Sequence, residues 1–171
     1  KTASSSSGGA DSSKFLPPTG MFVMEASSKP VVCQMFERYD YNRSSQIDAA
    51  ELQLLFYEIA GVFRTKDEIL HAVQGGTHRT DALDYNAFMV FWRNDPLLCV
   101  IKPGDPKFQK RNRAAVLFKR YDKLLRGYIS RAEFRFVHEE LSRENEIGGM
   151  SLLNCYKALD RESSGFVGFN D

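Results

Sequence analysis

The chain has 171 residues, of which 43% are hydrophobic and 12% aromatic, and its formal net charge is +1 at pH 7. This length allows one large or two small domains, and the apolar content is enough for a packed core. A nearly neutral chain gives no bulk electrostatic reason to bind nucleic acid, and no apolar run reaches the ~20 residues of a membrane-spanning helix. The 3 cysteines have no CxxC spacing, which favours free thiols in an intracellular, cytoplasmic setting over a disulfide framework.

Residues 1–28 are not expected to form a regular domain. Residues 1–14 are rich in Ser and Gly and have too few apolar side chains to offset the entropy of ordering, so we expect a flexible tail. Residues 15–20, FLPPTG, fit either a docked extended strap or an ordinary linker. From Pro30 onward, apolar residues recur at three- and four-residue intervals, which predicts a helix.

Residues 40–51 place oxygen-bearing side chains at the spacing of a cation-binding loop. A hard cation such as Ca²⁺ takes about six to eight oxygen ligands, which a twelve-residue loop supplies from alternating positions before a carboxylate closes the shell at position twelve. The candidate ligands are Asp40, Asn42, Ser44, the backbone carbonyl of Gln46, Asp48 and Glu51. Ser45 stands at position six, where the turn favours Gly, and a serine there costs about 1–2 kcal/mol. We therefore expect a weakened site, with a dissociation constant on the order of 10⁻⁵ M or poorer.

A second loop is predicted at residues 76–87, after a helix that has Thr65 as its N-cap. Gly76 and Ala87 stand where its first and last carboxylates would be, so it cannot complete a calcium shell. Leu83 is still expected to pair with Ile47 in a short β-bridge, which makes residues 29–94 one lobe. Prolines in residues 95–107 rule out a continuous helix and predict a bent linker there.

Residues 108–171 repeat the first lobe. The segment that starts at Phe118, FKRYDKLLRGYISRAEF, aligns with the segment that starts at Phe36, FERYDYNRSSQIDAAEL. The two are identical at seven positions, which include the first Asp and the last Glu of the loop. The third loop, residues 122–133, has Leu124 and Arg126 at two ligand positions and is not expected to bind metal. Ile129 and Val167, at position eight of the third and fourth loops, predict a second β-bridge.

The fourth loop, residues 160–171, has its own set of candidate ligands. They are Asp160, Glu162, Ser164, the carbonyl of Phe166 and Asp171. Asp171 is shorter than the usual glutamate at position twelve, which shifts the preference toward Mg²⁺. No outgoing helix follows this loop, so the last helix of the second lobe is truncated and we expect the native protein to continue beyond it.

Loops of this spacing between amphipathic helices resemble the EF-hand superfamily of calmodulin, troponin C and centrin, over roughly residues 29–171. The resemblance implies an all-α fold of four EF-hand motifs in two paired lobes, each with a short two-stranded β-bridge. It implies Ca²⁺, or Mg²⁺, at one or two of the loops, or a retained fold without metal. It also implies binding of protein segments such as amphipathic helices.

Three functions stay open at this point. The first is a calcium-binding adaptor, and the second is a calcium-insensitive structural subunit of a cytoskeletal or ciliary assembly. The third is a regulatory module of an enzyme. An enzyme activity of the chain itself is not expected, because His71, His78 and His138 are scattered and no GxSxG or GxxxxGK[ST] motif occurs.

Two further features bear on partners. A basic run fits either a solvated helix face or a surface for an acidic partner; its candidate contact residues are Lys110, Arg111, Arg113, Lys119 and Arg120. Apolar residues of the first lobe fit either its core or a groove for a target helix; they are Leu54, Leu55, Met89 and Phe91.

Overall fold

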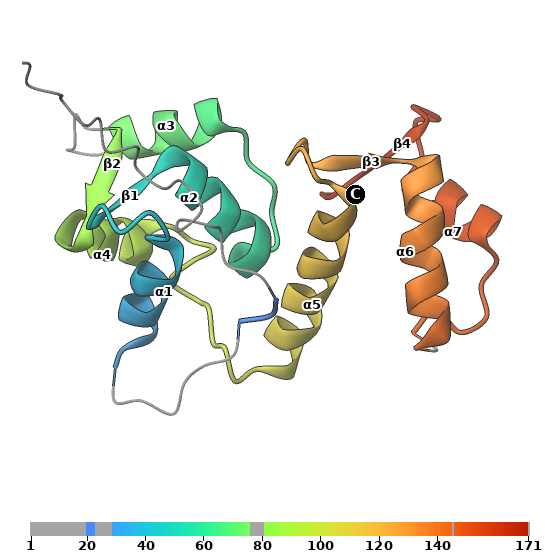
Figure 1. The fold of residues 1–171 in the computed structure, drawn as a ribbon, viewed down its shortest axis with the longest axis horizontal. Coiled ribbons are helices and arrows are strands. Elements are labelled where there is room, and N and C mark those ends of the chain that lie inside the picture. The colour runs from blue at the N-terminus through green and yellow to red at the C-terminus, as the bar shows by residue number, and fades with distance from the viewer. Residues whose placement is uncertain (1–19, 23–28, 76–80, 145, 171) are drawn as a thin grey trace, which may run out of the picture.

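The computed structural model describes residues 20–22, 29–75, 81–144 and 146–170. The described chain is mostly helical, with two small antiparallel two-stranded sheets (Figure 1). The first half contains, in order, α1 (Val31–Tyr39), β1 (Gln46–Asp48), α2 (Ala49–Leu55), the π-helical segment η2 (Phe56–Ala60), α3 (Lys66–Gln74), β2 (Ala82–Asp84) and α4 (Tyr85–Asn94). The second half contains α5 (Pro106–Tyr121), β3 (Tyr128–Ser130), α6 (Arg131–Arg143), α7 (Leu152–Leu159) and β4 (Phe166–Gly168).

Each sheet joins two loops of one half. β1 pairs with β2 so that Ile47 lies opposite Leu83, and β3 pairs with β4 so that Ile129 lies opposite Val167. These are the pairings expected from position eight of the loops. All four side chains are buried, because each bridge presents its central residue to a hydrophobic core.

Local signals in the sequence fix where the helices begin. Three helices start with a capping box, in which the N-cap side chain and a glutamate three residues later satisfy each other's backbone N–H groups. The pairs are Asp48 with Glu51, Thr65 with Glu68, and Ser130 with Glu133. Helix α5 starts at Pro106 behind the Asp105 cap, so the helix begins inside the region predicted as linker.

The buried apolar side chains form two clusters, one in each half. Met35, Tyr39, Leu52 and Phe88 belong to the first cluster, and Ile129 and Phe134 to the second. Phe22 also belongs to the first cluster, although it lies within residues 1–28, which were not expected to be part of a domain. The rest of that region, residues 1–19 and 23–28, lies outside the described residues.

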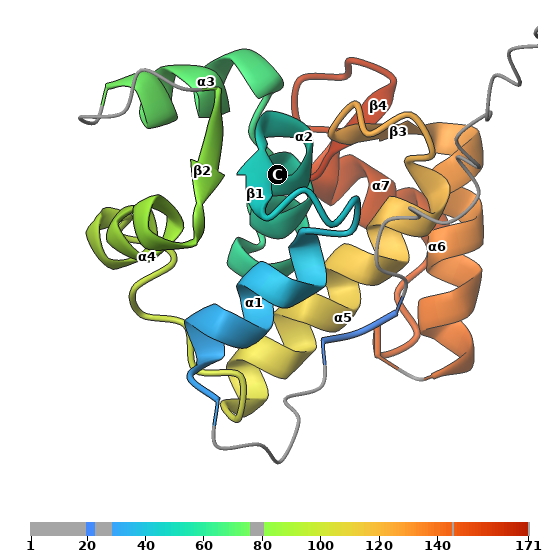
Figure 2. The ribbon, with the colours of Figure 1, turned by 60° about the vertical axis from the view of Figure 1, so that its left-hand side comes forward.

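The two halves also pack against each other. Helix α5 lies between the first half and the α6–α7 pair (Figures 1 and 2), and it contacts η2. The Tyr57 ring of η2 stacks on Phe169, with ring centroids 4.3 Å apart. The buried Glu58 carboxylate forms an ion pair with Lys119 of α5 and accepts a hydrogen bond from the Tyr39 hydroxyl at 2.7 Å. The linker therefore does not leave the halves separate, as a bent connector alone would suggest.

Candidate functional site

Three loops with predicted cation positions share one backbone conformation. Positions four and six of each loop have positive φ, in the left-handed region. Position four is Arg43, Leu125 and Ser163, at φ 57°, 49° and 56°, and position six is Ser45, Gly127 and Gly165, at φ 62°, 78° and 86°. In the second loop, residues 76–80 lie outside the described residues.

The aspartate at position one holds each of these turns. Its two carboxylate oxygens accept the N–H groups of positions five and six, one each. In the first loop, Asp40 accepts the N–H groups of Ser44 at 2.8 Å and Ser45 at 3.0 Å. In the third loop, Asp122 accepts those of Arg126 at 2.9 Å and Gly127 at 2.7 Å. In the fourth loop, Asp160 accepts those of Ser164 at 2.7 Å and Gly165 at 3.0 Å. The same acceptor therefore organises loops with very different ligand sets.

Glu51, at the last position of the first loop, is buried. One Glu51 carboxylate oxygen, Oε2, accepts the Asp48 N–H at 3.0 Å, which is half of the capping box of α2. Burial, and then the charges of Asp48 and Asp40, raise the pKa of Glu51 to about 7, although backbone hydrogen bonds oppose this shift. Burial is the largest cause because it disfavours the charged carboxylate, and the two neighbouring acids add to it.

The other predicted ligands of the first loop are hydrogen-bonded to one another. Asn42 accepts the Ser44 N–H at 2.8 Å through its side-chain oxygen, and the Ser44 hydroxyl donates to the Gln46 carbonyl at 2.9 Å. Within the described part of the chain, no three His, Cys, Asp or Glu side chains form a ready-made metal centre. The residues of the loop fit a cation in type and order.

The fourth loop is more open. Asp160, Glu162 and Ser164 line one cavity of about 280 Å³, together with Asn170. Partial desolvation raises the pKa of Asp160, but hydrogen bonds from Gly165 and Ser164 outweigh it, so that the pKa lies below its ordinary value. The Phe166 carbonyl accepts from the Ser164 hydroxyl at 3.2 Å. The twelfth ligand, Asp171, lies outside the described residues.

The third loop satisfies its charges within the chain. Asp122 is fully buried and accepts a hydrogen bond at 3.2 Å from the Tyr57 hydroxyl of the first half. Glu133 accepts the Ser130 N–H and hydroxyl, and these bonds together with the charges of Arg126 and Lys123 lower its pKa. Both carboxylates of this loop therefore have partners within the chain. The sequence predicted the loss of metal ligands here, but it gave no sign of the Tyr57 contact.

Most of the predicted basic surface is bonded within the chain. Arg113 pairs with Glu144 and Glu146, Lys119 with Glu58, and Arg120 with Glu140, while Arg111 donates to the Ile59 carbonyl at 3.4 Å. Lys110 is exposed and has no ion pair with any described residue. The buried Glu58 was missed at the sequence level, although a lone glutamate inside the apolar run LLFYEIA was a signal for it.

An apolar groove lies in the second half. It has a volume of about 240 Å³ and is lined mainly by aliphatic and aromatic side chains. They are Leu117, Phe118, Phe134, Val137, Leu141, Leu159, Val167 and Phe169, with Arg113 and Glu146 also on the lining. In the first half, Leu54 and Leu55 are buried in the core, and Phe91 packs edge-on against Phe56. The groove therefore lies in the second half, whereas the groove residues suggested by the sequence lie in the first half.

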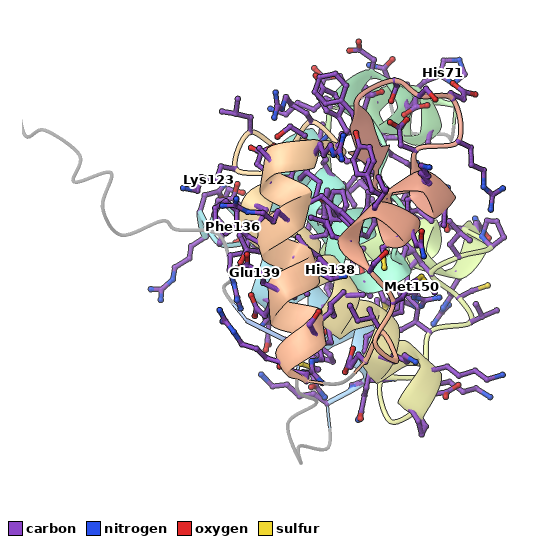
Figure 3. All side chains as sticks on the ribbon, turned by 90° about the vertical axis from the view of Figure 1, so that its right-hand side faces the viewer. His71, Lys123, Phe136, His138, Glu139 and Met150 are labelled. Carbon is purple, nitrogen blue, oxygen red and sulfur yellow. The ribbon has the colours of Figure 1, made fainter. Side chains whose placement is uncertain are left out.

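The described histidines form no common site. His71 lies on α3 and His138 on α6, on different parts of the molecule (Figure 3). The His138 ring nitrogen Nε2 is 2.9 Å from the Met150 carbonyl oxygen, which gives it a structural partner. His78 lies outside the described residues.

Comparison with protein families and with curated proteins finds no match to this chain. None of the described helices is both long enough and apolar enough to cross a membrane. What the chain does has to be inferred from the loops, the groove and the interface between the halves.

Proposed function

We propose that the chain is a non-enzymatic, EF-hand-like adaptor. It binds a divalent cation at its first loop and an amphipathic helix in the apolar groove of its second half. The observation that supports this most is the shared loop geometry. Three loops have left-handed residues at positions four and six and an aspartate that accepts two N–H groups from position one. This is the turn a twelve-residue cation loop needs.

The first loop is the preferred cation site because its acids are not neutralised. Burial raises the pKa of Glu51, and the negative charges of Asp48 and Asp40 raise it further. The residues that would hold Ca²⁺ are the predicted set, with Glu51 closing the shell. Asp160, Glu162 and Ser164 of the fourth loop would hold a second ion, with Mg²⁺ as the alternative to Ca²⁺.

The groove supports the helix-binding part of the proposal. Grooves that accept an amphipathic helix are lined by apolar side chains, against which the helix lays one face. Here Phe134, Val137 and Leu141 come from one helix, α6, and therefore form a continuous wall. Arg113 and Glu146, which form an ion pair with each other, are the charged residues of the lining.

Isothermal titration of the full chain with CaCl₂, and separately with MgCl₂, tests the metal part. We expect heat from one or two sites. Glu51→Gln removes the first-loop signal, because the amide cannot replace the bidentate carboxylate. Asp160→Ala removes the fourth-loop signal. Glu133→Gln is the matched control, and it leaves both signals in place. No heat in the wild-type chain would contradict the metal part.

The groove is tested with a fluorescein-labelled amphipathic helix of Leu and Lys. Leu141→Asp places a charge on the apolar wall, and we expect the affinity to fall by about tenfold or more. Lys157→Glu, on α7 and outside the groove lining, is the control. Equal affinities for the wild type and Leu141→Asp would exclude the groove as the binding site.

A second candidate is a structural subunit that does not respond to calcium. It is favoured by the interface between the halves, where Glu58 and Asp122 are fully buried and bonded across it. Such an interface fixes the halves whether or not a metal binds. Silence in the cation titration, together with binding of the helical peptide, would favour this candidate. Placement in the cytoplasm, the cytoskeleton or a cilium stays a prediction.

A further inference from the structure

A cleft between the two halves is lined by residues that the proposed function does not use. Its volume is about 470 Å³. The first half contributes Gln53, Phe63, Thr65 and Lys66, and the third loop with β3 contributes Leu124, Leu125, Arg126 and Tyr128. It is a different surface from the apolar groove, with which it shares no lining residue.

The cleft is positively charged. Lys66 and Arg126 are on its lining, and no acidic residue is. Lys66 is exposed and has no ion pair with the described residues, and Arg126 approaches Glu133 only at 4.0 Å. The nearby Glu68 carboxylate is engaged with the Thr65 N–H and hydroxyl, at 2.7 and 2.9 Å. Lys66 therefore has no carboxylate partner among the described residues. Arg126 lies over the Tyr128 ring, 4.7 Å from its centroid, and its contact with Glu133 is at the longest distance that still counts as an ion pair.

The same cleft exposes apolar surface. The Leu124 side chain is 74% exposed, and Tyr128 is 37% exposed. Leu124 and Arg126 stand at positions three and five of the third loop, where a cation loop has oxygen ligands. The two residues that remove this loop from metal binding are thus the ones that give the cleft an apolar and a cationic side chain.

The walls of the cleft are held in place before any ligand arrives. The Asn170 side chain binds both backbone groups of Phe63: its Oδ1 accepts the N–H at 2.9 Å, and its Nδ2 donates to the carbonyl at 3.1 Å. The third loop is fixed through Asp122 and Tyr57. A preformed cleft loses little conformational freedom on binding, which favours affinity.

We propose that this cleft binds an acidic peptide segment that carries one large apolar side chain. Carboxylates of the segment lie beside Lys66 and Arg126, and its apolar side chain packs on Leu124 and Phe63. The charge of the lining decides between partners, because a basic segment would be repelled and a purely apolar one would leave both cations unused. This binding needs no metal and no occupant in the groove.

The test is an NMR titration of the ¹⁵N-labelled full chain with a short peptide of Asp and Glu that has one central Phe. We expect amide shifts at Lys66, Leu124 and Arg126. Arg126→Glu should weaken binding by about tenfold or more. Lys123→Glu is the matched control, because it changes the same charge in the same loop from a residue outside the lining, and it should have a much smaller effect.

Two further peptides separate the contributions. Replacing the central Phe by Ser should weaken binding to the wild type but not to Leu124→Ser. A Lys peptide with the same Phe should cause no shifts. Leu141→Asp, which impairs the groove, should bind the acidic peptide as the wild type does. An amide spectrum with native dispersion shows that each variant is folded.

Three results would overturn the proposal. One is the absence of shifts at millimolar acidic peptide. Another is shifts confined to the exposed cations of α5, such as Lys110. The third is an equal loss from Arg126→Glu and Lys123→Glu, which would mean general attraction to positive charge.

Discussion

The first and third loops have the same backbone and opposite electrostatics. Each has left-handed residues at positions four and six, and each ends with a glutamate in a capping box. The pKa of Glu51 is raised to about 7 by burial and by neighbouring acids, whereas hydrogen bonds from Ser130 and the charges of Arg126 and Lys123 lower the pKa of Glu133. The shape of this turn therefore does not depend on a ligand shell.

What differs is the source of the compensating charge. The third loop receives it from its own Arg126 and a hydrogen bond from Tyr57 across the interface. In the first loop, Asp40, Asp48 and Glu51 form no ion pair with a described residue. Under the proposed function, the third loop is structural and the first loop binds a cation, and substitutions at equivalent positions should separate these roles.

The largest effect is expected at position six of the third loop. In Gly127→Ala the new Cβ would lie 2.3 Å from the Phe63 ring, at a backbone φ of 78°. We expect a loss of about 3–5 kcal/mol in the free energy of unfolding, from left-handed strain and overpacking together. Gly165→Ala is the matched control: its φ is 86° but its Cβ would meet nothing within 4 Å, so about 1–2 kcal/mol is expected. Urea denaturation of both measures this, and equal losses would mean that Phe63 does not pack there.

The next effect is at position one. Asp122→Ala removes the acceptor of two N–H groups and the Tyr57 hydroxyl from a buried site, and we expect a loss of about 2–4 kcal/mol. Asp160→Ala removes the acceptor of the equivalent two N–H groups in the more open fourth loop, where water can replace it. A loss of about 1 kcal/mol in the free energy of unfolding is therefore expected. Tyr57→Phe in the Asp122→Ala background should cost almost nothing further, because its partner is already gone. Losses that add fully would contradict this coupling.

The raised pKa of Glu51 predicts a pH dependence of stability without metal. The folded state keeps the Glu51 proton up to about pH 7, while the unfolded chain releases it near pH 4.5. Folding stability from this group therefore falls as the pH rises between these values. In chelator, Glu51→Gln should be more stable than the wild type by roughly 1–2 kcal/mol at pH 8, with the difference vanishing toward pH 4.

Urea denaturation of both proteins from pH 4 to pH 8 measures this difference directly. Groups that titrate in both proteins cancel in the comparison. Glu133→Gln is the control, and it should show the opposite trend, because its pKa is lowered. A difference between wild type and Glu51→Gln that does not change with pH would mean that the pKa of Glu51 is not raised in the folded state.

The sequence predicted the local features well, for a physical reason. Caps such as Thr65 and the aspartate at position one act within a few residues of themselves, and the pairing of Ile47 with Leu83 follows from the matching position eight of the two loops. The loops and their pairing could therefore be read directly from short patterns and from the internal repeat. The calcium ligands and partners derived from the same patterns stay predictions.

The contacts between the halves could not be predicted in this way. Tyr57 and Glu58 occur in an apolar helical run, and their partners Asp122 and Lys119 are more than 60 residues further along the chain, at separations of 65 and 61. The basic residues of α5 were likewise interpreted as a surface, because ion pairs such as Arg113 with Glu146 depend on tertiary packing. Long-range pairing of charges leaves no periodic signal in the sequence.

The smallest expected effect is at position six of the first loop. Ser45 has a φ of 62°, a conformation that glycine adopts without strain. Ser45→Gly should therefore stabilise the folded chain by about 0.5–1 kcal/mol, a value that already includes the greater freedom of glycine in the unfolded state. Ser44→Gly is the control of opposite sign, because the Ser44 hydroxyl donates to the Gln46 carbonyl and no left-handed strain is relieved there. If the loop binds Ca²⁺, the relief should appear as a severalfold gain in affinity in the same titration, since about 1.4 kcal/mol is tenfold. A gain in stability without a gain in affinity would mean that the turn is strained in both states and that its conformation does not limit cation binding.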